Sequence, residues 1–271
     1  MSKGLLIIGL FFLFSCRKDV IIQNEPIQNS FVIAGHAYGK PGTDQLRLYD
    51  KLVSQFATIK KMVNPLKVIF TGDVAVTATE QNWKNVLYEL DSFDIDFWIA
   101  PGNHDLLTNY LEQNVQSELF FSEKINDNLF IILNTNFPGW TINQPQLKMI
   151  ESELSNLKNV RNIFVFSHQV WWADDSLAPF DLERTFPNSG YLSEGSSTFW
   201  QDAFPIFEKV KTPVYFFSGD VGAFSWIPNF KFQQVDNFHF YASGMGSGIE
   251  DNVLHLKTFE SGKVEVERIN F

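Results

Sequence analysis

Residues 96–105 read DFWIAPGNHD: an apolar run of strand length, then proline, glycine and three polar side chains. The same form appears earlier at residues 67–73, KVIFTGD, and residues 80–90 between the two carry apolar side chains at helical spacing. A strand, helix, strand order of this kind indicates a parallel sheet, and α/β sheets carry their sites at the carboxyl ends of such strands. The sequence therefore places four polar side chains at one edge of a sheet: Asp73, Asn103, His104 and Asp105.

The rest of the chain extends this pattern. Further strands are predicted at residues 31–34, 128–134, 161–167 and 214–218. Further helices are predicted at residues 43–63, 144–157 and 199–210, with another after Asp105. Residues 231–271 have no helical pattern and predict an antiparallel meander with turns at residues 236–237, 244–251 and 261–262. A mixed, two-sheet α/β fold follows, without a repeat or composition shift that would mark a second domain.

The composition is that of a single globular domain. The chain has 271 residues, of which 45% are hydrophobic and 15% aromatic, and this suffices for one large core. The formal net charge of -10 and the pI near 4.9 argue against nucleic acid as a partner, because proteins that bind phosphate backbones usually carry a basic surface. A small phosphorylated substrate is compatible with this charge, since a bound metal ion reverses the local balance. We expect a monomer.

The first residues resemble a bacterial lipoprotein signal. Residues 4–15 are almost entirely apolar, follow Lys3 and end at Cys16 before two basic side chains. This stretch is too short to span a bilayer and is typical of a secretory signal. Residues 13–16 resemble a lipobox, although Phe14 is unusual there, and Cys16 is the position that would be acylated. A cleaved signal with an incidental thiol and an uncleaved anchor are the alternatives.

Cys16 is also the only cysteine of the chain, so no intramolecular disulfide is possible and the core must supply the stability. We predict a signal peptide over residues 1–15, a tether over residues 16–29 and one domain over residues 30–271. The predicted location is the cell envelope, where a lipid anchor on Cys16 would hold the protein on a membrane, facing the periplasm or the exterior.

Ligand-type side chains follow five of the predicted strands, and glycine stands beside them in four cases. In chain order they are His36, Asp73, Asn103 with His104 and Asp105, His168, and Asp220. This order resembles the calcineurin-like metallophosphoesterases, whose motifs read Asp-x-His, Gly-Asp, Gly-Asn-His-Asp/Glu, His, and Gly-His-x-His. The resemblance covers residues 30–240. It implies a four-layer α/β/β/α sandwich of two mixed sheets and hydrolysis of a phosphomonoester or phosphodiester.

The resemblance also implies a role for each matching residue. Asp73 would bridge two metal ions, with Asn103 and His168 on the second ion and His36 on the first. His104 would contact the phosphoryl oxygen or protonate the leaving group, with Asp105 as its neighbour. Divalent ions held by carboxylate and imidazole offset the charge of a phosphoryl group and lower the pKa of a bound water.

The departures from the motifs remove ligands from the first metal position but leave the second metal position complete. Ala34 stands where the family has an aspartate, and Asp220 and Gly222 stand where it has two histidines. The second-metal set therefore stays complete as Asp73, Asn103, His168 and Asp220, whereas the first-metal set keeps only His36 and the shared aspartate. We predict one tight ion and doubt a second. Three oxygen donors and one nitrogen favour Mn²⁺, Mg²⁺, Fe²⁺ or Ca²⁺ over Zn²⁺.

Three functions remain open on the sequence alone: an active envelope phosphoesterase with a small phosphorylated substrate, a catalytically impaired metal-binding or ligand-binding lipoprotein of the same fold, and a structural lipoprotein.

Several nearby residues have two interpretations each. Lys40 or Tyr38 could replace part of what a missing ion does, although a solvated lysine in a turn is the simpler reading. Trp171 and Trp172 could stack on a substrate beside Asp174 and Asp175, or could pack in the core. The glycine-rich residues 243–248 are interpreted as a tight connection beside the site, since they lack the lysine and helix of a phosphate-binding loop.

Overall fold

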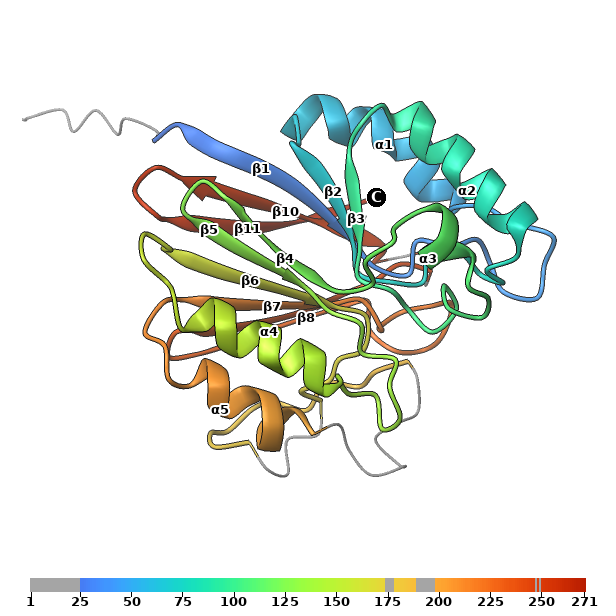
Figure 1. Ribbon diagram of the computed structural model, residues 1–271. Coiled ribbons are helices and arrows are strands. Elements are labelled where there is room, and N and C mark those ends of the chain that lie inside the picture. Colours follow the sequence, from blue (N-terminus) through green and yellow to red (C-terminus); the bar gives the residue numbers. More distant parts are fainter. Residues whose placement is uncertain (1–24, 174–177, 189–197, 247, 249) are drawn as a thin grey trace, which may run out of the picture.

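Two mixed β-sheets form the centre of the structure (Figure 1). The computed structural model describes residues 25–173, 178–188, 198–246, 248 and 250–271. The first sheet has the order β11-β10-β1-β2-β3 and comprises β1 (Ile27–Ala34), β2 (Lys67–Phe70), β3 (Phe97–Ile99), β10 (Asn252–Phe259) and β11 (Val264–Asn270). The second has the order β4-β5-β6-β7-β9-β8 and comprises β4 (Phe121–Ile125), β5 (Asn128–Ile132), β6 (Asn162–Ser167), β7 (Val214–Ser218), β8 (Phe230–Val235) and β9 (Phe238–Ser243).

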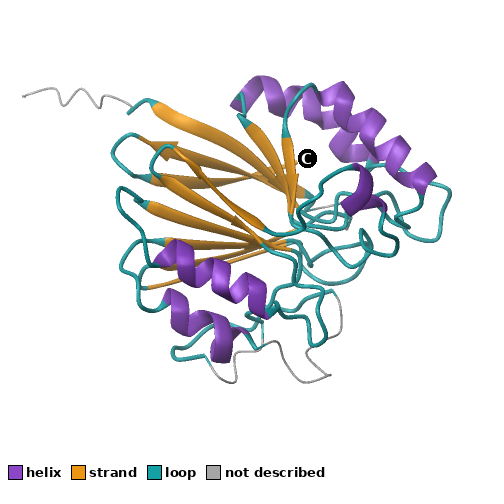
Figure 2. Cartoon of the chain, in the orientation of Figure 1, coloured by secondary structure: helices purple, strands orange, loops and turns teal. Residues whose placement is uncertain are grey.

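Helices cover the outer face of each sheet (Figure 2). The first sheet carries α1 (Asp50–Val63) and α2 (Glu80–Phe93), with the short α3 (Tyr110–Asn114) near its edge. The second carries α4 (Gln144–Leu154) and α5 (Phe204–Phe207), the latter preceded by a π-helical turn over Phe199–Ala203. The mixed, two-sheet α/β fold predicted from the sequence pattern is confirmed, and so is the four-layer α/β/β/α sandwich that the family resemblance implies.

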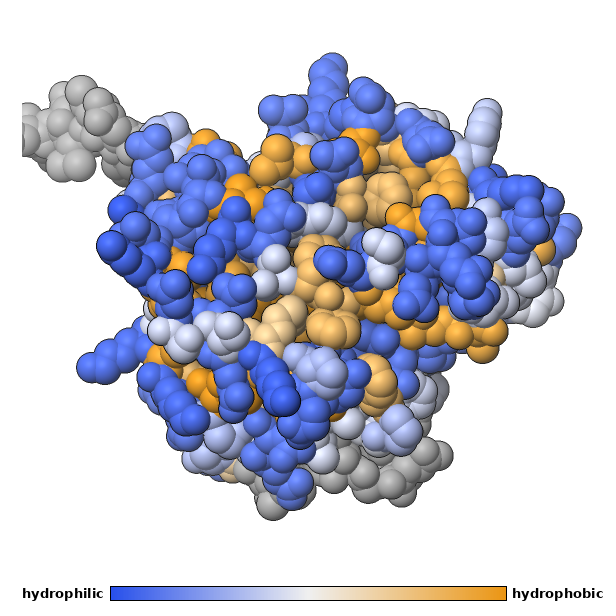
Figure 3. All heavy atoms as spheres, in the orientation of Figure 1, coloured by the Kyte–Doolittle hydropathy of each residue, from blue (hydrophilic) through white to orange (hydrophobic). Residues whose placement is uncertain are grey.

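Alternation along the strands builds the layers. In β1, Phe31 and Ile33 face the second sheet, where the ring of Phe31 lies 4.8 Å from that of Phe130. Val32 and Ala34 face the opposite way and pack under α1 and α2. Each fully buried side chain of this size contributes roughly 1.5–3 kcal/mol of transfer free energy. On the face shown in Figure 3, hydrophilic side chains predominate and hydrophobic ones appear between them.

Parallel pairing sets the position of the site. β1, β2 and β3 run parallel to one another, as do β5, β6, β7 and β9. Their carboxyl ends therefore point to one end of the sandwich, where the connecting loops gather (Figure 2).

The predicted meander over residues 231–271 is wrong as a single unit. β8 and β9 pair in the second sheet, with β9 parallel to β7, whereas β10 and β11 pair in the first sheet. The turns at residues 236–237 and 261–262 are confirmed, but residues 244–251 cross between the sheets. Local alternation identifies hairpins and does not encode which sheet receives them, because long-range packing decides that.

Several element boundaries differ from the prediction. The helix expected over residues 43–63 begins at Asp50, because Leu48 bridges Tyr38 as an extended residue and its N–H donates to Glu89. The helices expected after Asp105 and over residues 199–210 are short, and β4 is a strand that the sequence pattern does not reveal.

β1 starts at Ile27 and so includes the last residues of the predicted tether. Cys16 and residues 1–15 lie outside the described residues. Within the described part of the chain, no helix has the length and apolar character needed to cross a membrane.

Candidate metal centre

Four loops at the carboxyl ends of the strands bring four predicted ligands together. His36 follows β1, Asp73 follows β2, His168 follows β6 and Asp220 follows β7. His36 Nε2 lies 3.1 Å from Asp73 Oδ2, and His168 Nε2 lies 3.4 Å from Asp73 Oδ1. Asp220 Oδ1 lies 3.7 Å and 4.0 Å from the same two nitrogens. All four side chains are buried, and we call them the ligand cluster.

Backbone carbonyls fix the orientation of both imidazoles. His36 Nδ1 lies 3.0 Å from the carbonyl oxygen of Val221, and His168 Nδ1 lies 2.9 Å from that of Thr71. A carbonyl only accepts, so each Nδ1 carries the proton and donates it. Each Nε2 then presents a lone pair towards the carboxylates, and neither Nε2 has a hydrogen-bond partner.

Lone pairs and carboxylate oxygens that face one another in a buried space repel unless a proton or a cation lies between them. The ligand atoms of His36, Asp73 and His168 all lie within 4.8 Å of one another. One ion can contact all of them, because ligand-to-metal distances are about 2.0–2.6 Å. The residues present therefore fit a divalent cation.

The charges of the cluster shift its pKa values accordingly. Burial opposes protonation of His36, but the carboxylates of Asp73 and Asp220 outweigh it and raise the pKa of His36. Burial likewise opposes ionisation of Asp73, yet the imidazoles of His168 and His36 hold the pKa of Asp73 well below its ordinary value. The negative potential that favours a proton on His36 equally favours a metal ion.

Glycine is required where the loops cross. Gly72 has φ +79°, and a Cβ there would overlap with the imidazole of His168. A Cβ at Gly102 would overlap with the carboxylate of Asp73. His36 and Asp73 also adopt positive φ, 48° and 56°, a conformation that costs a non-glycine residue about 1–2 kcal/mol. The fold thus holds these ligands in a conformation that an isolated loop would avoid.

Asn103 adjoins the ligand cluster. The N–H of His104 donates to Asp73 Oδ1 over 3.1 Å, which places the loop of Asn103 against the central carboxylate. The side-chain oxygen of Asn103 is buried and has no hydrogen-bond partner. An acceptor left in this way is suited to a cation.

Asp105 does not hold the imidazole of His104, contrary to the prediction. Its carboxylate accepts four backbone N–H groups at 2.8–2.9 Å, those of Asp73, Val74, Ala75 and Gly102. The partner of His104 Nδ1 is instead the carbonyl oxygen of Val76, at 2.7 Å. Asp105 therefore shapes the loop that carries Asp73, and Val76 orients the imidazole.

The segment that carries the ligand cluster matches a known family. The model of the family described as calcineurin-like phosphoesterase matches residues 36–224, which include every residue of the ligand cluster. The chain belongs to the calcineurin-like phosphoesterase family. The predicted family is thus confirmed.

Solved structures similar to this calcineurin-like phosphoesterase are distant in sequence. A Thermotoga maritima protein solved by solution NMR has 10% identity and a TM-score of 0.40, with 90% of this chain and 99% of that chain covered. A double mutant of Vps29 from Entamoeba histolytica has 11% identity and a TM-score of 0.36, with 89% and 99% covered. A single mutant of the same protein has 10% identity, a TM-score of 0.36 and the same coverage. No curated protein matches the chain.

The two positions without ligands are closed in this calcineurin-like phosphoesterase. Ala34 is fully buried in the core beneath the helices. Gly222 has φ +79°, and a Cβ there would lie 3.0 Å from the carbonyl oxygen of Met245 and 3.2 Å from Asn229 Cγ. A histidine at residue 222 would therefore require the loop to move. His36 shares one cluster with His168 instead of forming a separate set.

One aromatic residue contacts the ligand cluster, and a second packs behind it. Tyr38 is 2% exposed, and its ring lies 5.4 Å from that of His36 and 5.1 Å from that of His104. Phe224 stacks on Tyr38 with ring centroids 6.5 Å apart, and no sequence signal marks this phenylalanine. Lys40, the other residue considered, is exposed.

Other predicted neighbours fall outside the site. Trp171 and Trp172 are 1% and 2% exposed and pack in the core of the second sheet, so they cannot stack on a substrate. Asp174 and Asp175 lie outside the described residues. The N–H of Met245 donates to the carbonyl oxygen of Gly35 over 3.1 Å, consistent with a tight connection beside the site.

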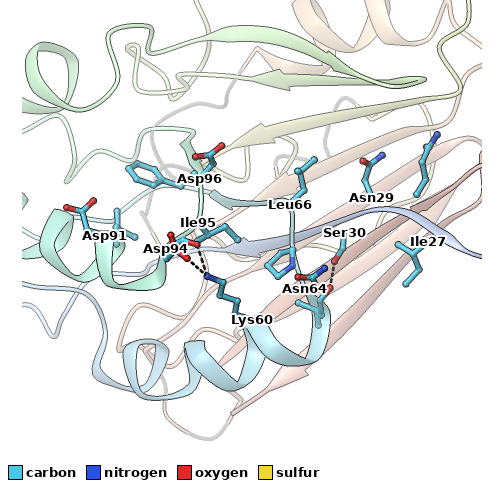
Figure 4. Close-up of a pocket in the computed structure, with 15 residues that line it drawn as sticks. Ile27, Asn29, Ser30, Lys60, Asn64, Leu66, Asp91, Asp94, Ile95 and Asp96 are labelled. Atoms are coloured by element: carbon cyan, nitrogen blue, oxygen red, sulfur yellow. Dashed lines mark hydrogen bonds and ion pairs between the residues drawn. The ribbon is translucent and has the colours of Figure 1, made fainter.

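A separate cavity of about 880 Å³ lies at the opposite end of the first sheet (Figure 4). Its lining includes Ile27, Ser30, Lys60, Leu66 and Asp96. There, Lys60 Nζ donates hydrogen bonds to the carbonyl oxygens of Phe93 and Asp94, over 2.8 Å and 2.6 Å. Ile27, Leu66 and Asp96 stand at the amino ends of β1, β2 and β3, so the cavity is not part of the metal centre.

Proposed function

We propose that the protein is a metal-dependent phosphoesterase that hydrolyses a small phosphomonoester or phosphodiester in the bacterial cell envelope. One observation carries the proposal: two imidazole Nε2 lone pairs and two buried carboxylates face one another within 4.0 Å, without hydrogen bonds to the nitrogens.

One ion would be held by Asp73, Asn103, His168 and Asp220, with His36 as a further ligand. Three oxygen and two nitrogen donors favour Mn²⁺ or Fe²⁺, because the second imidazole weakens the case for Mg²⁺ and Ca²⁺. When bound, such an ion offsets phosphoryl charge and activates water.

His104 would protonate the leaving group. Its Nδ1 donates to the carbonyl oxygen of Val76, and its backbone N–H donates to Asp73, so the ring has a fixed position beside the cluster. Nε2 is the remaining ring nitrogen. In its protonated form it can donate a proton to the departing oxygen.

Tyr38 would donate a hydrogen bond to the phosphoryl group, in place of Lys40. Burial, then the nearby carboxylates of Asp73, Asp220 and Asp105, raise the pKa of Tyr38 far above its ordinary value. The phenol therefore stays protonated and acts as a neutral donor.

The remaining parts of the proposal rest on the sequence. Acylation of Cys16 would anchor the protein to the envelope membrane, and the net charge of -10 favours a small substrate over nucleic acid. The protein would act as a monomer.

The experiment has two steps. Purified protein is analysed for bound metal, and then p-nitrophenyl phosphate and bis-p-nitrophenyl phosphate are offered with Mn²⁺, Mg²⁺ and Zn²⁺. We expect turnover that is lost in Asp73→Asn with folding retained. If the protein binds metal but hydrolyses no phosphoester, the result contradicts the phosphoesterase and favours a metal-binding lipoprotein. If it binds no metal, both of these functions are contradicted.

A further inference from the structure

Two exposed aromatic side chains lie against each other, one from the loop after β7 and one from the segment of residues 178–188. Trp226 is 82% exposed and Phe186 is 44% exposed, with ring centroids 6.4 Å apart and planes tilted by 52°. A single exposed apolar side chain is common, but two contiguous exposed rings form an apolar patch of the kind that marks binding surfaces.

Both aromatic residues stand within a few residues of positions that contact the loop of Asp220 or belong to it. Trp226 belongs to the loop between β7 and β8 that begins with Asp220, and it stands two residues beyond Phe224, which stacks on Tyr38. Phe186 stands two residues before Asn188, whose N–H donates to the carbonyl oxygen of Asp220 over 2.8 Å. The pair therefore lies beside the loop that holds a metal ligand.

The segment that carries Phe186 is fixed to β8. Gln233 accepts a hydrogen bond from the N–H of Glu183 and donates to its carbonyl oxygen, and Lys231 pairs with the Glu183 carboxylate. The guanidinium of Arg184 lies 5.2 Å over the ring of Phe186. The anchored segment thus presents the ring of Phe186 and the cation of Arg184 next to Trp226, and little ordering of this segment is needed before a ligand can bind.

We propose that Trp226 and Phe186 bind a planar aromatic group of the substrate while its phosphoryl group lies at the ligand cluster. This proposal rests on the proposed function. Aromatic rings stack on other planar π-systems, and the planar guanidinium of Arg184 beside Phe186 can do the same. The substrate class is then a phosphoester that carries a nucleobase or an aryl group.

The test uses the full-length, metal-loaded protein and two substrate pairs. Adenosine 5′-monophosphate is compared with ribose 5-phosphate, and benzyl phosphate with methyl phosphate, as ratios of kcat/KM. The leaving alcohols within each pair have similar pKa values, so leaving-group chemistry does not set the ratio. The pair with the larger ratio identifies whether a nucleobase or an aryl group is preferred. We expect the aromatic member of at least one pair to be preferred roughly tenfold or more, the range of stacking on an aromatic side chain.

Trp226→Ala should bring that ratio close to one and leave the non-aromatic member unchanged. Tyr88→Ala is the matched control, because Tyr88 is 79% exposed on α2, and it should keep the ratio. A readout without turnover is saturation-transfer NMR on the metal-free protein, where the base or phenyl protons should lose their signal in Trp226→Ala.

Equal kcat/KM within both pairs, or an unchanged ratio in Trp226→Ala, would overturn the inference while the proposed function stands. Failure of the wild type on all four compounds would also overturn the inference, and the proposed function falls with it only if p-nitrophenyl phosphate and bis-p-nitrophenyl phosphate are not hydrolysed either.

Discussion

At the scale of single residues, two backbone carbonyls decide what the centre can bind. Those of Thr71 and Val221 accept hydrogen bonds from the Nδ1–H groups of His168 and His36, so that Nε2 of each ring points at Asp73. The sequence identifies the histidines by their order after strands. It cannot identify these carbonyls, because their role depends on backbone positions that only the fold brings together.

The sequence also misassigns Asp105 for a similar reason. Adjacency in the motif suggests a contact with His104, but the carboxylate turns to the amides of residues 73–75. Every residue type except proline carries a backbone N–H group, so the sequence does not show which of these groups a sharp loop directs at Asp105. Ligand identity could therefore be predicted, whereas the supporting contacts could not.

Removal of the Tyr38 hydroxyl should impair catalysis without loss of metal. In Tyr38→Phe the ring packing with Phe224 remains and one hydrogen bond to a charged group is lost, so kcat/KM should fall by about tenfold or more. Tyr49→Phe is the control: Tyr49 also contacts Phe224, but its hydroxyl donates to Asp251. Equal activity of Tyr38→Phe and wild type at equal metal content would remove the phenol from the mechanism.

Substitution of Gly72 should destabilise the fold. In Gly72→Ala the new Cβ overlaps with His168, in addition to the strain of a positive φ, so we expect a loss of about 2–4 kcal/mol in the free energy of unfolding. Gly42→Ala isolates the backbone effect, because Gly42 has φ +75° and nothing within 4 Å of a Cβ. It should cost about 1 kcal/mol. Urea denaturation compares the two, and equal losses would contradict the close packing of Gly72.

At the scale of elements, the strand and helix order of the first half follows from sequence patterns, since β1, α1, β2, α2 and β3 each have a clear period. The second half follows less well. β4 is an edge strand with no fully buried residue, so its sequence lacks an apolar run. The β8–β9 and β10–β11 hairpins look alike in sequence pattern, yet they join different sheets. Their sheet is chosen by core packing between distant residues, which a local pattern does not contain.

Asp251 secures the crossing between the sheets. Its buried carboxylate accepts hydrogen bonds from the Tyr49 hydroxyl, the Asn229 amide and the N–H of Gly246, and it pairs with Lys51. Burial opposes ionisation, but these donors outweigh it and lower the pKa of Asp251. Asp251→Asn should cost about 1–3 kcal/mol at neutral pH.

The lowered pKa of Asp251 also predicts how the loss of unfolding free energy in Asp251→Asn depends on pH. A lowered folded-state pKa contributes stability above the unfolded-state value, and this contribution is lost as pH falls through the folded-state pKa. The gap in unfolding free energy between wild type and Asp251→Asn should therefore narrow under acid conditions. A gap that stays constant from pH 7 to acid pH would show that the charge of Asp251 is not the cause.

At the scale of the whole molecule, the sandwich brings loops from both sheets to one end, where a shared cation would join them. Binding to the folded state alone raises stability, by about 2.7 kcal/mol at a free Mn²⁺ concentration of one hundred times Kd. For a chain of this size we expect the melting temperature to rise by about 5–10 °C. His168→Asn should lose this rise, and His239→Asn, on β9 outside the cluster, should keep it. A rise of equal size in both variants would place the ion elsewhere.

The most direct test of a shared cation is the metal content of the protein after dialysis against Mn²⁺, measured by mass spectrometry for wild type and Asp73→Asn. We predict one tightly bound ion per chain in the wild type and none in Asp73→Asn, since Asp73 contacts both imidazoles of the cluster. A wild type without metal, or an Asp73→Asn variant that keeps its ion, would contradict the account.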